Sequence, residues 1–234
     1  MRSSLCMCRH AESGTESEAS VEFYYDLISP NAYLAWHALR DIARLHKREL
    51  ILKPVLFAAL LRAHDQVGPA EVAPKMQWMV RNCLRKANEL GIALTPPHSH
   101  PFNPLLTLRL MLACPATDRA RLTDILFRAV WAESRNVTDP DSMSDLLTAN
   151  DFDADRMLKL ADSDAIKGLL RTETESAVSR SVFGVPTIIV DGELFFGFDD
   201  LPWLERYLRG EDPIGKKEFA AWLTVQPSAW RFRR

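Results

Sequence analysis

The chain has 234 residues, of which 47% are hydrophobic and 26% are charged, with a formal net charge of −2 at pH 7. Such a composition is typical of a globular protein that is long enough to bury a core without disulfides or metals. The small net charge gives no electrostatic reason to expect nucleic acid or an anionic membrane surface as a partner, and no apolar run approaches the roughly 18 residues that span a bilayer.

The N-terminal segment 1–20 is rich in Ser, Glu and Ala, which predicts a disordered tail. Its apolar stretch is too short for a secretory signal, and the acidic residues that follow argue against a transit peptide. The four cysteines are divided between this tail and distant helical segments, which is no disulfide framework and favours a reducing, cytoplasmic location. Cys6, Cys8 and His10 could hold a metal ion, but such ligands in a tail are more often incidental, so no metal is expected.

Ordered structure is expected to begin with the run VEFYYDLI (21–28), whose aromatic and β-branched residues predict a strand. Ser29 and Pro30 follow as a helix N-cap and a proline at the first helical position. Apolar residues at helical spacing then predict a helix to about His46. The run ELILKPVLF (49–57) predicts a second strand.

The middle of the chain, 58–182, is expected to be wholly helical because apolar residues recur there at helical spacing. The predicted helices cover 75–90, 103–112, 118–134, 139–148 and 153–182. Gly91 ends the first of them.

Strands return near the C-terminus. VPTIIV (185–190) and ELFFG (193–197) predict two strands joined by Asp191 and Gly192, a strong hairpin signal. Asp199 is expected to cap a last helix.

The order of elements predicts an α/β protein with a thioredoxin-like fold, β-α-β followed by β-β-α, with a large all-helical insertion. The thioredoxin-like domain would comprise 21–57 and 183–210, and the insertion 58–182. Residues 211–234 would form a C-terminal tail.

Chemistry in a thioredoxin-like fold is expected where the first strand meets the first helix, because free N–H groups and the helix dipole there stabilise an anion. Redox enzymes place Cys-x-x-Cys at this point, whereas this chain has Ser29-Pro30-Asn31-Ala32. Dithiol–disulfide exchange is therefore excluded. Taken alone, Ser29 is interpreted as a helix N-cap, because Ser-Pro is common at helix starts.

Two further positions have both a structural and a functional interpretation. Pro186 can simply begin a strand, or it can form a cis peptide bond after Val185, whose backbone N–H and C=O would then pair with a peptide-like ligand. Asp199 can be an ordinary helix cap, or it can hold the ammonium group of a ligand.

Taken in order, the segments FYYDLISPNAYLA, KPVLF, KMQWM, VFGVPT and FFGFDDLPWLE resemble the 2-hydroxychromene-2-carboxylate isomerases and the kappa-class glutathione transferases. These are relatives of the DsbA-type oxidoreductases. The resemblance covers about 21–210, and the ordered set of segments carries it.

The resemblance implies glutathione as a cofactor and a role for each matching residue. The hydroxyl of Ser29 would donate to the glutathione sulfur and favour its thiolate. The backbone of Val185, before Pro186, would pair with the cysteinyl part. Asp199 would meet the γ-glutamyl ammonium, and Lys75 the glycyl end.

The sequence departs from the family at two of the implied cofactor-binding positions. Phe198 replaces a small hydroxyl residue of the transferases that meets the γ-glutamyl carboxylate, so backbone N–H groups alone would make that contact. Gln66 replaces an asparagine near the sulfur, and its longer side chain would move the amide.

Other polar and aromatic residues are interpreted structurally. His98 and His100 lack a third metal ligand nearby and are expected on a surface loop. Trp78 and Trp131 lie on apolar helix faces and are expected in the core, or as walls of a substrate pocket in the insertion.

Three functions remain open from the sequence. A glutathione-dependent isomerase of a small aromatic substrate is favoured by YDLISPNAYLA and by the VGP segment (67–69). A kappa-type transferase or peroxidase would consume the thiol, and a peptide-binding module would have no turnover. The resemblance also implies a homodimer.

Overall fold

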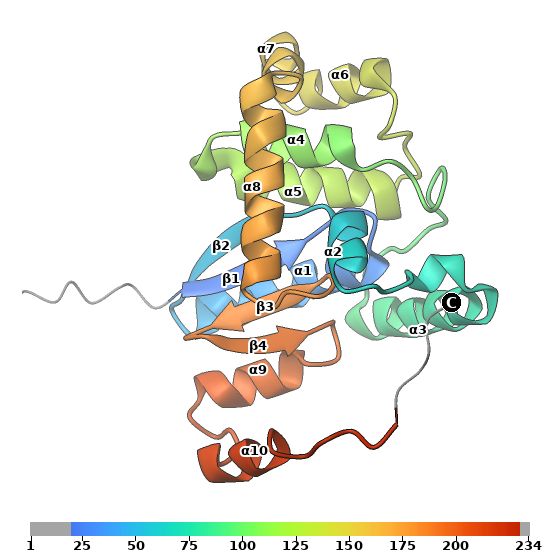
Figure 1. Cartoon of the computed structure of the whole chain (residues 1–234). Coiled ribbons are helices and arrows are strands. Elements are labelled where there is room, and N and C mark those ends of the chain that lie inside the picture. The colour runs from blue at the N-terminus through green and yellow to red at the C-terminus, as the bar shows by residue number, and fades with distance from the viewer. Residues whose placement is uncertain (1–19, 230–234) are drawn as a thin grey trace, which may run out of the picture.

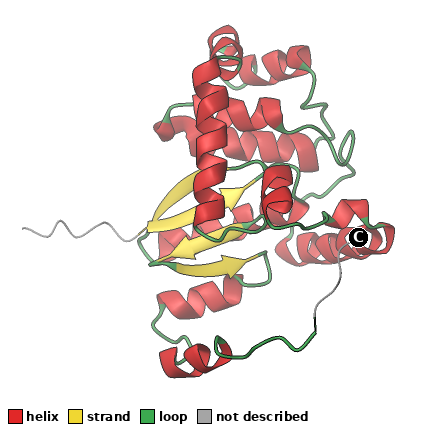
Figure 2. Cartoon of the chain, in the orientation of Figure 1, coloured by secondary structure: helices red, strands yellow, loops and turns green. Residues whose placement is uncertain are grey.

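The structure, a computed structural model, describes residues 20–229 and contains a mixed four-stranded sheet with helices around it (Figure 1). The strands are β1 (Ser20–Tyr25), β2 (Glu49–Pro54), β3 (Thr187–Val190) and β4 (Glu193–Phe196). The helices are α1 (Pro30–Leu45), α2 (Phe57–Ala63), the 3-10 turn η1 (Pro69–Glu71), α3 (Ala73–Leu90), α4 (Leu105–Ala113), α5 (Ala116–Trp131), α6 (Pro140–Thr148), α7 (Ala154–Ala161), α8 (Asp164–Ser179), α9 (Leu201–Leu208) and α10 (Lys216–Trp222). The predicted order of β-α-β, a helical block and β-β-α is confirmed, and Figure 2 shows the segment between β2 and β3 without strands.

The strands lie in the order β2-β1-β3-β4. Phe23 of β1 pairs with Leu52 in the parallel direction and with Ile188 in the antiparallel direction. A parallel pair needs a crossover connection, which α1 supplies between β1 and β2. The sheet therefore brings the C-terminal end of β1 and the N-terminal end of β3 to the same edge.

The β3–β4 hairpin forms at the predicted Asp191-Gly192 turn. Asp191 has φ 50° and Gly192 has φ 88°, so both central residues are in the left-handed region. A two-residue turn of this kind matches the twist of antiparallel strands. The start of β3 lies beside the end of β1 because these two strands pair directly, with Tyr24 opposite Thr187.

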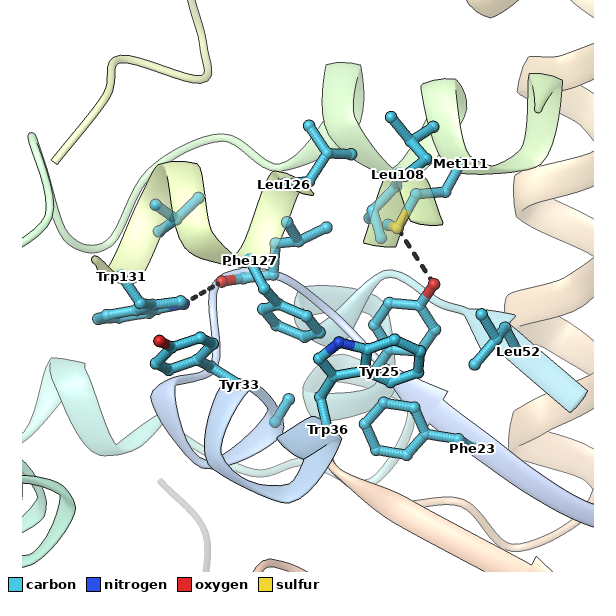
Figure 3. Packing of buried hydrophobic residues seen from close by; sticks show 14 of the residues in the cluster. Phe23, Tyr25, Tyr33, Trp36, Leu52, Leu108, Met111, Leu126, Phe127 and Trp131 are labelled. Carbon is cyan, nitrogen blue, oxygen red and sulfur yellow. Dashed lines mark hydrogen bonds between the residues drawn. The ribbon is translucent and has the colours of Figure 1, made fainter. Parts of the chain in front are cut away.

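The main core lies on one face of the sheet, where alternate residues of β1 point (Figure 3). The rings of Phe23 and Tyr25 stack at 4.8 Å, and Trp36 of α1 packs against Phe23. The Tyr25 hydroxyl reaches the sulfur of Met111 at 3.1 Å, which joins the sheet to α4. Tyr24 points to the other face, into a smaller cluster with residues of α2 and α8.

One predicted helix was wrong in its extent. The segment 153–182 forms two helices, α7 and α8, because Ser163 caps α8 by accepting a hydrogen bond from the Ile166 N–H at 3.4 Å. Serine favours such a cap over a helix interior since its side chain competes for backbone groups.

The predicted strand ends also shift. The first strand runs from Ser20 to Tyr25 and not over 21–28, because Asp26 to Ile28 turn toward α1. The second strand stops at Pro54, since α2 begins at Phe57. The rest of the tail predicted over 1–20, with Cys6, Cys8 and His10, lies outside the described residues.

The C-terminal region holds two further corrections. Helix α9 begins at Leu201 with Asp200 at its N-cap position, so the prediction that Asp199 caps this helix is wrong. The segment predicted as a tail, 211–234, contains the helix α10 below α9 in Figure 1.

Candidate functional site

Ser29 lies at the junction of β1 and α1 and caps the helix, as predicted. Its Oγ accepts a hydrogen bond from the Ala32 N–H at 3.2 Å, and Pro30 occupies the first helical position. The hydroxyl donates to the Val185 carbonyl at 3.4 Å, which is long for an O–H···O contact. The Ser29 proton is therefore only weakly engaged, whereas its lone pair is held by the helix.

Val185 and Pro186 lie directly opposite Ser29, before β3 begins. The Val185–Pro186 peptide bond is cis, as predicted. The Val185 side chain is buried, and its carbonyl oxygen points to the Ser29 hydroxyl. The structure thus brings the predicted catalytic serine and the predicted peptide-pairing backbone together.

Asp199 forms an ion pair that the sequence did not predict. Its Oδ2 accepts from the Lys86 ammonium at 2.8 Å, and the side chain of Lys86 is 8% exposed against 71% for Asp199. The same ammonium donates to Asn31 Oδ1 at 3.3 Å and lies 5.1 Å from the centre of the Phe198 ring. Lys86 therefore ties α3 to the first turn of α1 and to the turn before α9.

Cys83 lies one turn before Lys86 on α3. Its Sγ is 3.7 Å from Asn31 Oδ1, and the side chain is buried. Burial raises the pKa of this thiol to about 11, against a smaller opposing effect of Lys86. The Cys83 thiol is therefore protonated at neutral pH.

Lys75 and Gln66 are exposed and lie farther along the chain from the Ser29 region. Within residues 20–229, no hydrogen bond or ion pair links either side chain to Ser29, Val185 or Asp199. Lys75 is in the first turn of α3, and Gln66 lies between α2 and η1. Their assignment to the cofactor stays a prediction.

Two aromatic side chains from the helical segment support the loop that precedes Ser29. Trp131 is buried, as expected, and its Nε1 donates to the Leu27 carbonyl at 2.9 Å (Figure 3). The His100 Nε2 is 3.0 Å from the Ile28 carbonyl, and its ring meets the edge of Trp131. Burial lowers the pKa of His100, so the neutral ring donates to Ile28.

The expected surface location is thus wrong for His100, which is half-buried, while His98 is exposed. Trp78 is exposed as well, contrary to the prediction that it lies in the core. Neighbouring residues in the sequence do not predict the partial burial of His100 or the exposure of Trp78, because both depend on which distant segment packs against the side chain.

Asp26 is a buried carboxyl group three residues before Ser29 that the sequence analysis passed over. Its two oxygens accept from the Ile28 N–H at 3.1 Å and the Phe57 N–H at 3.0 Å, which joins the Ser29 loop to α2. Loss of solvation raises its pKa to about 7. The signal was available: an acid inside an aromatic and aliphatic run predicts a buried polar contact.

Two large cavities lie away from Ser29. One of about 580 Å³ lies between α1 and α5, and one of about 500 Å³ lies between α2, α4 and α8. Neither is lined by Ser29, Val185 or Asp199, so neither cavity would place the ring of an aromatic substrate beside Ser29.

Residues 20–229 hold neither a cluster of metal ligands nor a helix that could cross a membrane. No group of three or more His, Cys, Asp or Glu side chains there could hold a metal ion. In the same part of the chain, none of the helices has the length and apolar character needed to cross a bilayer.

Comparison with known proteins agrees with the thioredoxin-like fold. Residues 20–209 match the model of the DSBA-like thioredoxin domain family. The chain is 30% identical to the 2-hydroxychromene-2-carboxylate isomerase of Sphingobium xenophagum over 81% of this chain and 97% of that protein. It is 24% identical to glutathione S-transferase kappa 2 of Caenorhabditis elegans, over 80% and 91% of the two chains.

The fold also matches a solved structure. A structure of a 2-hydroxychromene-2-carboxylate isomerase superimposes with a TM-score of 0.76, covering 88% of this chain and 99% of that one at 24% identity. This match spans both the sheet and the helices between β2 and β3.

Proposed function

The chain belongs to the DSBA-like thioredoxin domain family, in the group of the 2-hydroxychromene-2-carboxylate isomerases and kappa-class glutathione transferases, and we propose that it is a glutathione-dependent isomerase. Its substrate is an aromatic-degradation intermediate such as 2-hydroxychromene-2-carboxylate. The greater identity to an isomerase than to a kappa-class transferase supports this choice.

The observation that carries the proposal is the hydrogen bonding of the Ser29 hydroxyl. Its oxygen is fixed by the Ala32 N–H, and among the described residues its proton has only the Val185 carbonyl, at 3.4 Å, as acceptor. A thiolate beside it would be a stronger acceptor, and the N-terminus of α1 would add a favourable field. Ser29 is thus suited to hold a sulfur anion that belongs to a bound molecule.

Glutathione would lie along the face of α3 that carries Lys86. Lys75 and Lys86 are eleven residues apart, about three turns, so they share this face at a separation of roughly 16 Å along the axis. The cysteinyl part would pair with the Val185 backbone, and the γ-glutamyl end would reach Asp199. Lys75 would then meet the glycyl carboxylate, and Gln66 would lie near the sulfur or the substrate.

In the proposed reaction, the glutathione thiolate adds to the substrate and is regenerated in the last step. The ring C–O bond of the substrate's cyclic hemiketal opens first, which leaves a free phenol and a ketone conjugated with a double bond. The sulfur adds to that conjugated system, which becomes an enolate, and the bond that loses its double character rotates. Elimination then restores the double bond and the ketone and releases the thiolate. Ser29 stabilises the sulfur anion at the start and at the end, and glutathione is not consumed.

Two alternatives share this site. A kappa-type transferase or peroxidase would consume the thiol, and a non-catalytic module would bind peptide at the Val185 edge without turnover. Thiol counting combined with a turnover assay separates all three.

The test combines binding and turnover. Calorimetry should give one glutathione bound per chain, and 2-hydroxychromene-2-carboxylate should equilibrate with its ring-opened isomer only when glutathione is present. Free thiol, titrated before and after, should be unchanged. A fall in thiol that matches product formation would favour the transferase, and binding without turnover would favour the peptide module.

The proposal includes a homodimer in the cytoplasm. Met76, Val80 and Leu84 form an exposed apolar stripe at helical spacing on α3, which supports burial against a second copy. The free thiols of Cys83 and Cys114 fit a reducing compartment. Light scattering after gel filtration should give twice the chain mass for the wild type and one chain mass for Val80→Glu; a monomeric wild type would contradict the dimer.

A further inference from the structure

Lys86 is a charged group that the proposed reaction leaves without a role. It lies on α3, its side chain is 8% exposed, and its ammonium reaches residues of two other segments, the first turn of α1 and the turn before α9. A charge taken out of water in this way is costly unless it is paired. Its position beside the first turn of α1 therefore needs an explanation beyond solubility.

The ion pair with Asp199 has one buried partner and one open partner. Asp199 is 71% exposed, so a ligand can approach its carboxylate from solvent. The Lys86 ammonium has three N–H donors, and within residues 20–229 it has two hydrogen-bond acceptors, Asn31 and Asp199. The third donor therefore has no hydrogen-bond acceptor among these residues and is available to an oxygen of a ligand.

We propose, on the basis of the glutathione site above, that Lys86 and Asp199 together form a receptor for the free α-amino acid end of the γ-glutamyl group. Asp199 binds the α-ammonium, and Lys86 binds the α-carboxylate. A γ-glutamyl peptide carries both charges on one carbon atom, whereas an ordinary peptide N-terminus carries only the ammonium. The pair therefore selects γ-glutamyl thiols over other cysteinyl peptides.

Phe198 gives this pairing a physical reason. Phe198 occupies the position where the transferases that this chain resembles have a hydroxyl side chain for the same carboxylate. A phenyl ring has no hydrogen-bond donor and cannot bind that carboxylate. The Lys86 ammonium lies 5.1 Å from the centre of that ring, so a cation is close to the position that lacks the hydroxyl. The proposal adds Lys86 to the backbone N–H groups that the sequence analysis expects at the carboxylate.

A purely structural role for Lys86 predicts the opposite behaviour. If Lys86 only neutralises Asp199, its removal would free the Asp199 carboxylate and strengthen the binding of any ligand ammonium. If Lys86 binds the carboxylate, its removal weakens only those ligands that have one.

The experiment compares two ligands on four proteins by calorimetry. The ligands are glutathione and γ-aminobutyryl-cysteinyl-glycine, the same tripeptide without the α-carboxylate. The proteins are the wild type, Lys86→Gln and Arg85→Gln, in which the neighbouring residue on α3 is exposed and undergoes the same loss of charge. Lys86→Arg is added because it keeps the charge.

The wild type should bind glutathione roughly tenfold more tightly than the decarboxylated tripeptide, a charge-assisted contact of about 1.4 kcal/mol. Lys86→Gln should abolish that preference, while Arg85→Gln and Lys86→Arg keep it. A preference that survives in Lys86→Gln, or is absent in the wild type, would overturn the role of Lys86 alone. A wild type that binds neither tripeptide would overturn the glutathione site itself.

Discussion

Replacement of Ser29 by alanine separates helix capping from catalysis. In the structure, Ser29→Ala removes the acceptor of the Ala32 N–H at 3.2 Å and the long donation to Val185 at 3.4 Å. Loss of the cap costs about 1 kcal/mol, and the long contact adds at most about 0.5 kcal/mol. For a chain of this size, the melting temperature should therefore fall by roughly 2–5 °C.

The effect on turnover should be larger and should depend on pH. If the hydroxyl stabilises the bound thiolate, its removal raises the pKa of the glutathione thiol, and the rate at neutral pH should fall by about ten- to a hundredfold, or roughly 1.4–2.7 kcal/mol of barrier. Raising the pH should recover part of that rate, because the thiol then ionises without help. The assay is initial isomerisation rate from pH 6 to 10 at saturating glutathione.

Ser163 is a matched control for this prediction. It caps α8 in the same manner, accepting from the Ile166 N–H at 3.4 Å and donating to the Leu160 carbonyl at 2.6 Å. Ser163→Ala should lose similar stability and keep the wild-type rate and pH profile. Equal rates and unshifted profiles for Ser29→Ala and Ser163→Ala would show that Ser29 is only a cap, and would refute the proposed mechanism.

Three further predictions concern the surroundings of Ser29. Asp199→Asn should weaken glutathione binding by about 1–3 kcal/mol in calorimetry, because a charge-assisted contact is lost; unchanged affinity would remove Asp199 from the site. Because burial holds the pKa of Asp26 at about 7, above that of an unfolded chain, its protonated form stabilises the fold at low pH and this contribution is lost as the pH rises through about 7. Urea unfolding from pH 4 to 8 should therefore show this decline in the wild type and lack it in Asp26→Asn; parallel curves would contradict the burial of the charge. Trp131→Phe should cost about 1–3 kcal/mol in the same assay, since the buried Leu27 carbonyl loses its donor, and an unchanged midpoint would count against that bond.

The sequence predicts well where a structural element depends on neighbouring residues. The Ser29-Pro30 helix start and the Asp191-Gly192 hairpin were both found at their predicted positions, because each requires only a particular side chain or a positive φ at that place. The approach of Ser29 to the start of β3 depends on the pairing of β1 with β3, and it was expected only from the family resemblance.

The sequence predicts poorly where a role depends on distant partners. Nothing in the sequence distinguishes Lys86 from other helix lysines, because its partners Asn31 and Asp199 are 55 and 113 residues away. His100 likewise meets Ile28 across 72 residues. Neither contact has a signature in spacing, because it depends on how the helices between β2 and β3 pack against the sheet.

The two described cysteines explain why the site suits a thiol that comes from outside. Burial raises the pKa of both Cys83 and Cys114 to about 11, so neither provides a thiolate at neutral pH. The N-terminus of α1 keeps the electrostatic character that favours a sulfur anion, but Ser29 offers a proton there and no sulfur of its own. In the proposed mechanism the nucleophile is therefore a bound thiol, and an anchor remote from its sulfur would hold it in position. The Lys86–Asp199 pair, linked to the first turn of α1 through Asn31, is placed to be that anchor.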